Sequence, residues 1–278
     1  MKVFTVDLEK EYGTQGGELD CLLADEPYDG NDESWARPAV IVVPGGAYAH
    51  VSKREGEPIA FEFLSLGFHA FVLRYVVGGE NGLPYPEQLI ELGASVDYLK
   101  KHAKELRVNP DEIFVVGFSA GGHLTGDLAV EYASVSEKAG KTLDCKPAGV
   151  GLCYPVITER GHKGSFDNLL YGYSDEAKTE LLKTLELHKG VTEDTPPAFL
   201  WAMAKDDAVK VQDNVLLYAQ ACAEKNVDFE LHIYPEGFHG SSTGRAEINA
   251  GNPSCLKRTL PWTDDCASFF RLYCKEEF

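Results

Sequence analysis

Short apolar segments alternate with amphipathic segments along most of this chain. The apolar segments have the length of buried strands and lie at residues 39–43, 70–75, 112–117, 148–153, 197–203 and 229–234. Between them, apolar residues recur at three- and four-residue spacing, which predicts helices. These helices are expected at residues 58–64, 86–106, directly after 119, at 212–225 and at 263–274. Strands that alternate with helices predict an α/β fold with a mostly parallel central sheet flanked by helices.

Two parts of the chain depart from this alternation. Residues 3–8 and 18–24 are short and lie close together, which predicts an antiparallel hairpin at the leading edge of the sheet. Residues 156–196 separate two expected strands and contain a helical run at 175–185. Long excursions from a compact sheet are often lids or binding loops. Since no repeat or linker divides the chain, we expect one domain over residues 1–278 with a small lid or cap at 156–196.

A serine between glycines follows the most strongly apolar strand. Residues 113–116 lead directly into Gly117-Phe118-Ser119-Ala120-Gly121, and a helix-compatible segment comes next. Strand, sharp turn and helix form the context in which Gly-x-Ser-x-Gly acts as a nucleophile elbow. The turn forces Ser119 into a strained backbone conformation, and side chains at Gly117 and Gly121 would collide where strand and helix nearly touch. Ser119 is therefore the candidate nucleophile.

A serine hydroxyl needs a base that accepts its proton, and histidine is the usual one. Of the eight histidines in the chain, His239 is distinctive because glycines bracket it in a loop directly after the last expected strand. Loops that leave the carboxyl ends of parallel strands are where such sheets hold their sites. Other histidines have simpler interpretations. His102 lies on an expected helix and His232 in an expected strand. Polar surroundings, expected at the surface, apply to His69, His162 and His188.

The imidazole in turn needs an acid that fixes its tautomer and stabilises its charged form. Asp206 and Asp207 follow the strand that ends near Met203, again at a carboxyl end. The chain order serine, aspartate, histidine is the order expected of an elbow enzyme. One of the two aspartates is expected to be an ordinary turn residue, and the pattern leaves open which one.

Donors for the developing oxyanion complete the candidate site. Pro44-Gly45-Gly46-Ala47-Tyr48 follows the strand at 39–43, and its small residues allow backbone N–H groups to approach a substrate closely. The N–H of Ala120, immediately after the nucleophile, would join them. We therefore expect an oxyanion hole formed by the N–H groups of Gly46, Ala47 and Ala120.

Composition and charge exclude several classes of function. The 278 residues carry a formal net charge of −18, which disfavours binding to nucleic acid or to an anionic membrane. The N-terminal residues lack the apolar region of a signal peptide, and no apolar stretch is long enough to span a bilayer, so a cytoplasmic protein is expected. Seven cysteines, an odd number with no Cys-x-x-Cys pair, favour reduced thiols over disulfides or a zinc site. No cofactor or metal is expected.

Four segments together resemble a known family. They are Pro44-Gly45-Gly46-Ala47-Tyr48, Arg54-Glu55-Gly56-Glu57-Pro58-Ile59-Ala60, Gly117-Phe118-Ser119-Ala120-Gly121-Gly122-His123-Leu124 and Glu236-Gly237-Phe238-His239-Gly240. From about residue 36 to 240 the chain is similar to the α/β-hydrolase esterases, within the lipase/esterase and acetyl-xylan-esterase-like branch related to hormone-sensitive lipase. Individually the motifs are not specific for that branch, whereas together they are.

The resemblance carries over to individual positions. It places the triad acid on Asp206, although Lys210 stands where the family usually has proline, which leaves Asp207 as a neighbouring candidate. Ala47 replaces the family's third glycine, and its methyl group would narrow the acyl pocket. His123, which the family shares, is expected to pack or hydrogen-bond structurally. Four aromatic side chains could border the pocket and stack on a sugar, although ordinary packing is the simpler interpretation of each. They are Tyr48, His50, Tyr85 and Phe238.

Ser119, His239 and Asp206 together predict a cofactor-free serine esterase that works through an acyl-enzyme. The resemblance implies short acyl groups, with acetyl esters of sugars or xylo-oligosaccharides as plausible substrates. One alternative is a serine peptidase of the prolyl-oligopeptidase type, which has a similar elbow and triad but usually a large extra domain for which 278 residues leave little room. A second alternative is a non-catalytic binding protein on a hydrolase fold, although such relatives typically lose the serine or the histidine.

Overall fold

The strands of the computed structural model form one eight-stranded sheet. The structure describes residues 1–25, 35–245, 247–249 and 260–275. The strands are β1 (Lys2–Asp7), β2 (Glu18–Leu23), β3 (Arg37–Val43), β4 (His69–Arg74), β5 (Val108–Phe118), β6 (Gly149–Cys153), β7 (Ala198–Met203) and β8 (Phe229–Tyr234). Their spatial order is β1-β2-β4-β3-β5-β6-β7-β8. The first two pairings, β1 with β2 and β2 with β4, are antiparallel, and every later pairing is parallel.

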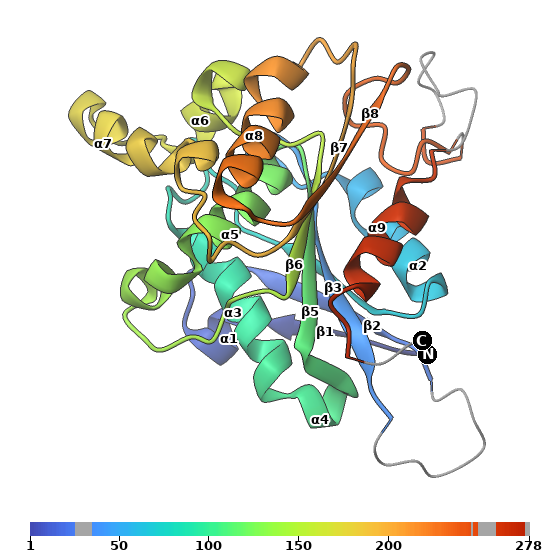
Figure 1. Cartoon of the computed structure of the whole chain (residues 1–278). Coiled ribbons are helices and arrows are strands. Elements are labelled where there is room, and N and C mark those ends of the chain that lie inside the picture. Colours follow the sequence, from blue (N-terminus) through green and yellow to red (C-terminus); the bar gives the residue numbers. More distant parts are fainter. Residues whose placement is uncertain (26–34, 246, 250–259, 276–278) are drawn as a thin grey trace.

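Helices cover both faces of this sheet (Figure 1). One face carries α2 (Glu57–Ser65) and α9 (Trp262–Arg271), and the other carries α3 (Glu87–Lys101), α5 (Ala120–Ala139) and α8 (Val215–Lys225). Two short helices, α1 (Leu8–Tyr12) and α4 (Ala103–Leu106), follow β1 and α3. The mostly parallel α/β sheet and the N-terminal antiparallel hairpin that the sequence predicts are both confirmed.

The expected single helix at residues 86–106 is wrong in one detail. The helix ends at Lys101, and His102 separates it from the single turn of α4. The imidazole Nδ1 of His102 lies 3.0 Å from the carbonyl oxygen of Tyr98, and its ring stacks on that tyrosine at 4.0 Å between centroids. Helical periodicity in the sequence does not predict this local interruption of the helix.

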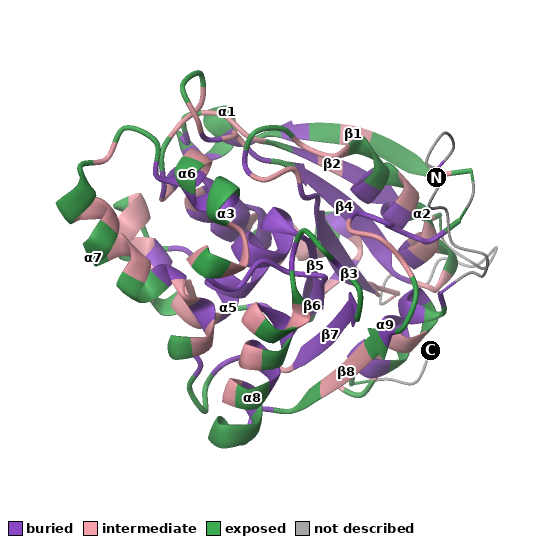
Figure 2. Ribbon diagram, turned by 90° about the horizontal axis from the view of Figure 1, so that it is seen from above, coloured by how far each residue is buried: buried purple, intermediate pink, exposed green. Residues whose placement is uncertain are grey.

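The insertion between β6 and β7 holds two helices and two single turns. These are η2 (Glu159–Gly161), α6 (Lys163–Leu169), α7 (Asp175–Leu185) and η3 (Leu187–Lys189). In Figures 1 and 2, α7 projects away from the sheet, and most of its surface is exposed. The sequence prediction of a helix at 175–185 is confirmed. By contrast, α6 lies against the body of the protein, where Phe166 and Leu169 are buried.

The central strands are buried on both faces, as Figure 2 shows by their purple colour. Aromatic rings fill the layer beneath α9, where Phe114 stacks on Phe270 at 4.3 Å and Trp201 on Trp262 at 5.2 Å. Such packing makes the sheet a rigid support for the loops at its carboxyl edge. Those loops begin after β3, β5, β6, β7 and β8, and they contain the candidate site residues.

Candidate active site

The turn between β5 and α5 has the geometry expected of an elbow. Ser119 has φ 52° and ψ −115°, a left-handed conformation that non-glycine residues rarely adopt. A Cβ atom added to Gly117 would lie 2.2 Å from the carbonyl oxygen of Gly121, and one added to Gly121 would lie 2.2 Å from that of Val43. The two predictions from the sequence, a strained serine and glycines required by close approach, are therefore confirmed.

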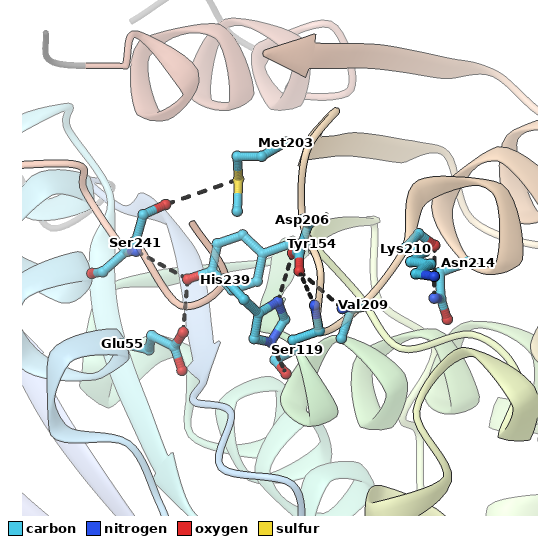
Figure 3. Close-up of polar contacts among 12 residues, drawn as sticks. Glu55, Ser119, Tyr154, Met203, Asp206, Val209, Lys210, Asn214, His239 and Ser241 are labelled. Atoms are coloured by element: carbon cyan, nitrogen blue, oxygen red, sulfur yellow. Dashed lines mark hydrogen bonds and ion pairs between the residues drawn. The ribbon is translucent and has the colours of Figure 1, made fainter. Parts of the chain in front are cut away.

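Three side chains from different loops meet at this turn (Figure 3). The hydroxyl oxygen of Ser119 lies 2.7 Å from Nε2 of His239, and Nδ1 of His239 lies 2.7 Å from Oδ2 of Asp206. Because a carboxylate only accepts hydrogen bonds, Nδ1 carries the proton and Nε2 is free to accept the serine proton. The arrangement can activate the serine hydroxyl as a nucleophile.

Asp206 is held in place by its own turn. Its side chain is fully buried, and Oδ1 accepts hydrogen bonds from the backbone N–H groups of Ala208 and Val209, each at 2.9 Å. Asp207 is exposed. The backbone between β7 and α8 thus directs Asp206, and not Asp207, toward His239.

A buried glutamate that the sequence analysis gave no role connects two of these loops. Glu55 is only 3 % exposed. Its Oε2 accepts the N–H of Gly45 at 3.0 Å, and its Oε1 accepts the hydroxyl of Tyr154 at 2.7 Å. The same hydroxyl accepts the N–H of Ser242 at 3.0 Å. One carboxylate therefore fixes the glycine loop after β3 and, through Tyr154, the loop of His239. Figure 3 shows the contact between Glu55 and Tyr154.

Tyr154 also contacts the imidazole directly. Its ring lies edge-on to His239, with 5.2 Å between the centroids. The only signal for Glu55 in the sequence was its place in the Arg54-Glu55-Gly56 segment, just before the start of α2. A charged residue beside a helix start is ordinarily solvated, so the pattern did not single it out.

The loop after β3, where the oxyanion hole is predicted, has a backbone conformation that favours small residues. Gly46 has φ 128°, and a Cβ atom there would lie 1.9 Å from the carbonyl oxygen of His50, so only glycine fits. Ala47 follows with φ 53°. Its carbonyl oxygen accepts a hydrogen bond from Nδ2 of Asn168 in α6 at 2.9 Å. The insertion therefore helps to hold this loop in place.

The N–H of Ala120 lies in the first turn of α5, where helix donors have no partner within the helix. The N–H of Ser119, by contrast, is bonded to the carbonyl of Cys153 at 3.0 Å. Gly46 and Ala47 line the same cavity as Ser119, and Ala120 is next to Ser119 in the chain. The partial positive charge of the α5 N-terminus favours an anion there.

The cavity at Ser119 is small, and most of the residues that line it have polar side chains. It has a volume of about 210 Å³ and is lined by Gly46, Ala47, His50, Ser52, Arg54, Glu55, Ser119, His162, His239 and Gly240. Among these lining residues, the methyl group of Ala47 is the largest purely aliphatic side chain. The small volume limits the size of any group beside Ser119, and the polar side chains offer hydrogen-bonding partners to a ligand.

The aromatic residues proposed from the sequence to border the pocket have different positions. His50 lines the cavity. Tyr48 and Tyr85 are buried, at 1 % and 3 % exposure, so neither ring has a face free to stack on a sugar. Phe238 is half-buried and is not among the lining residues. For both tyrosines the ordinary packing interpretation is the one the structure supports.

His123 has the structural role that was expected. The carbonyl of Leu185 accepts a hydrogen bond from its Nε2 at 2.9 Å, so its Nδ1 accepts the hydroxyl of Tyr48 at 2.9 Å. Burial lowers the pKa of His123 to about 4, which keeps the imidazole neutral. The expected surface position of His69 is wrong, since it is 1 % exposed, and His162 lies in the cavity described above.

No metal or membrane feature accompanies this site in the part of the chain that the structure describes. There, no group of three or more His, Cys, Asp or Glu side chains is arranged to hold a metal ion. The helices within the described ranges are too short or too polar to cross a bilayer. The described cysteines are unpaired, and Cys255 lies outside the described residues.

Comparisons with known proteins agree with this geometry. The model of the prolyl oligopeptidase family matches residues 91–266, and a model described as BD-FAE matches residues 28–146. The chain is 34 % identical over 246 residues to an endo-1,4-beta-xylanase B of Butyrivibrio fibrisolvens, covering 87 % of this chain and 38 % of that protein. It is 29 % identical over 251 residues to an acetylxylan esterase of Xylanibacter ruminicola, covering 87 % of this chain and 47 % of that protein.

A solved structure is similar to almost the whole chain. An acetyl ester-xyloside bifunctional hydrolase from Caldicellulosiruptor lactoaceticus superimposes with a TM-score of 0.75 at 32 % identity, covering 92 % of this chain and 88 % of that one. This match extends over nearly the whole of both chains. The two curated relatives are longer, and the chain spans less than half the length of each.

Proposed function

Because this chain is a serine esterase with the α/β-hydrolase fold and belongs to the prolyl oligopeptidase family, we propose that it removes short acyl groups, above all acetyl, from esterified sugars or xylo-oligosaccharides. The observation that carries this proposal is the small cavity around Ser119, whose largest purely aliphatic lining side chain is the methyl group of Ala47. The printed names of two relatives, an acetylxylan esterase and an acetyl ester-xyloside hydrolase, point to the same chemistry.

In the proposed mechanism, the oxygen of Ser119 attacks the ester carbonyl carbon while Nε2 of His239 accepts the hydroxyl proton. Asp206 holds the imidazole in the required tautomer and stabilises its charged form. The N–H groups of Gly46, Ala47 and Ala120 stabilise the negative oxygen of the tetrahedral intermediate.

Collapse of that intermediate breaks the bond to the alcohol oxygen, which receives the proton from His239 and leaves. The acyl group now esterifies Ser119. His239 next takes a proton from a water molecule, which attacks the acyl carbon and releases the acid, and the serine regains its proton. No cofactor is needed for any of these steps.

We propose that residues 1–278 form one domain, with residues 156–196 as its cap. We also propose that the protein is cytoplasmic, because an odd set of seven cysteines suits a reducing compartment. Since the curated relatives are more than twice as long as the matched region, the activity of any longer protein that contains this chain is part of the proposal too.

A series of nitrophenyl esters from acetyl through butyryl to octanoyl, assayed beside an acetylated xylo-oligosaccharide, tests the proposal. We expect kcat/KM to be highest for acetyl and to fall as the acyl chain lengthens, with acetate released from the oligosaccharide. The Ser119→Ala variant is the control, and it should lose the burst of nitrophenol that marks acyl-enzyme formation. A preference for octanoyl esters would refute the assignment to short acyl groups.

The family match itself favours one second candidate, a serine peptidase. A proline-containing amide assayed beside the acetyl ester separates the two activities, and faster turnover of the amide would favour the peptidase.

A non-catalytic binding protein is tested by labelling with a fluorophosphonate probe. We expect labelling that disappears in Ser119→Ala, whereas an unlabelled protein would support the binding role.

A further inference from the structure

His162 belongs to the insertion between β6 and β7, yet it lines the cavity that contains Ser119 and His239. We propose that Nε2 of His162 donates a hydrogen bond to a hydroxyl oxygen of the alcohol part of the substrate. This interaction would make the enzyme selective for esters of polyhydroxy alcohols such as sugars. The inference rests on the proposed esterase function and adds a residue that determines its specificity.

The hydrogen bonds of His162 determine which ring nitrogen carries the proton. Its Nδ1 accepts the backbone N–H of Ser165 at 3.2 Å, so the imidazole caps the first turn of α6. The hydroxyl of Ser165 also lies 2.9 Å from Nδ1. A backbone N–H can only donate, and Nδ1 must therefore be unprotonated. In the neutral ring the proton is on Nε2, which makes this atom a hydrogen-bond donor.

The surroundings of His162 favour the neutral ring. Burial lowers its pKa and the charge of His239 lowers it further, whereas a hydrogen bond with its own backbone and the charge of Asp206 act in the opposite direction. Protonation of Nδ1 would also abolish the cap of α6, because that nitrogen would no longer accept the N–H of Ser165. A neutral donor suits a hydroxyl oxygen better than it suits a carboxylate.

The free edge of the ring is the one that carries Nε2. Nδ1 is occupied by Ser165, and Gly164 lies over Cε1, where a Cβ atom on that glycine would be 3.4 Å away. Within the described ranges of the chain, no protein group is a hydrogen-bond partner of Nε2. Because Nδ1 is occupied by Ser165 and His162 lines the cavity, we infer that Nε2 is the ring nitrogen that faces the cavity.

The position of His162 relative to His239 indicates the alcohol side of the substrate. His239 must reach the alcohol oxygen in order to protonate it as it leaves. The two imidazoles line the same cavity. In a sugar ester, a second hydroxyl is attached to the carbon next to the esterified one. A donor beside His239 therefore lies where that neighbouring hydroxyl is expected, whereas a nitrophenyl group has no such oxygen there.

Two substitutions separate hydrogen bonding to the substrate from capping of α6. His162→Asn retains a side-chain oxygen that can cap the helix, but it is too short to present a donor in place of Nε2. His162→Gln has an amide N–H about where Nε2 stands, but it cannot cap in the same way. Both variants are compared with the unsubstituted protein by kcat/KM for an acetylated xylo-oligosaccharide and for nitrophenyl acetate, and by thermal unfolding.

We expect the ratio of the two kcat/KM values, sugar ester over nitrophenyl acetate, to fall about 10- to 100-fold in His162→Asn, as for the loss of one hydrogen bond to a substrate hydroxyl. In His162→Gln the ratio should stay within about threefold of that of the unsubstituted protein, even if the unfolding temperature drops. An unchanged ratio in His162→Asn, or an equal fall in both variants, would overturn the inference. An unsubstituted protein that cleaves nitrophenyl acetate but not the sugar ester would instead refute the proposed function, and this inference with it.

Discussion

Replacing Asp206 with asparagine tests the proposed triad most sharply, because the structure defines what the amide can and cannot do. The carboxylate has one oxygen on Nδ1 of His239 and the other on two backbone N–H groups, those of Ala208 and Val209. Asparagine has only one oxygen. If that oxygen faces His239, the amide N–H₂ faces the buried N–H of Val209 and the half-buried N–H of Ala208, which costs about 1–3 kcal/mol for the buried unsatisfied donor alone.

The amide will therefore keep its oxygen on the backbone donors and turn its N–H₂ toward His239. Nδ1 must then accept a hydrogen bond, and the proton moves to Nε2, which can no longer accept the proton of Ser119. We expect kcat to fall by about 10⁴-fold, equivalent to about 5.4 kcal/mol at 1.36 kcal/mol per factor of ten. The cost of the alternative orientation shows why the variant cannot easily avoid this loss.

The assay is steady-state and burst kinetics with nitrophenyl acetate, with Asp207→Asn as the matched control. Asp207 is exposed, and its replacement should change kcat by no more than about twofold. Retention of more than about a tenth of the activity in Asp206→Asn would refute the tautomer argument. A severe loss in Asp207→Asn would show that the neighbouring carboxylate is the triad acid.

Three further predictions concern other parts of the structure. Glu55→Gln replaces the charged acceptor of the Gly45 N–H by a weaker one, so kcat should fall about tenfold with little change in KM. A change in KM alone would argue against a role of Glu55 in holding the glycine loop after β3. Gly117→Ala places a methyl group 2.2 Å from the carbonyl oxygen of Gly121, so differential scanning calorimetry should show that the free energy of unfolding falls by about 1–3 kcal/mol. An unchanged Tm would contradict the close approach of the strand and the helix. Burial raises the pKa of Asp127 to about 8, so its protonated form is favoured by folding, and its contribution to stability is lost as pH rises from about 4 to 8. Asp127→Asn should therefore gain stability relative to the unsubstituted protein between pH 5 and pH 8 in urea unfolding, and a relative loss would be the contrary result.

The sequence alone determined the fold and the location of the elbow, because both depend on local patterns. The strand predicted at 112–117 lies within β5 (Val108–Phe118), and burial on both faces of the sheet explains its uninterrupted apolar composition. Gly117 could be interpreted from the sequence because its close contact is with Gly121, only four positions away, whereas the contact that requires glycine at position 121 is with the distant Val43. His239 was distinguishable because a glycine-bracketed loop after a strand is also a local feature.

Only the tertiary structure shows which of Asp206 and Asp207 contacts His239. The two are adjacent and chemically identical, so no composition or spacing argument distinguishes them. What distinguishes them is the direction of each side chain, which the turn after β7 sets by donating two backbone N–H groups to Asp206. Similarly, Tyr48 and Tyr85 could be proposed for the pocket until their burial was known.

Glu55 and His162 required the tertiary structure for a different reason. Glu55 bonds to Tyr154, 99 residues away along the chain, and His162 reaches the cavity from an insertion whose path the sequence does not specify. A buried carboxylate and a solvated one have the same sequence signature, and the same is true of a cavity histidine and a surface histidine. Burial and the identity of hydrogen-bond partners depend on contacts between distant segments, so they become defined only when the chain is folded.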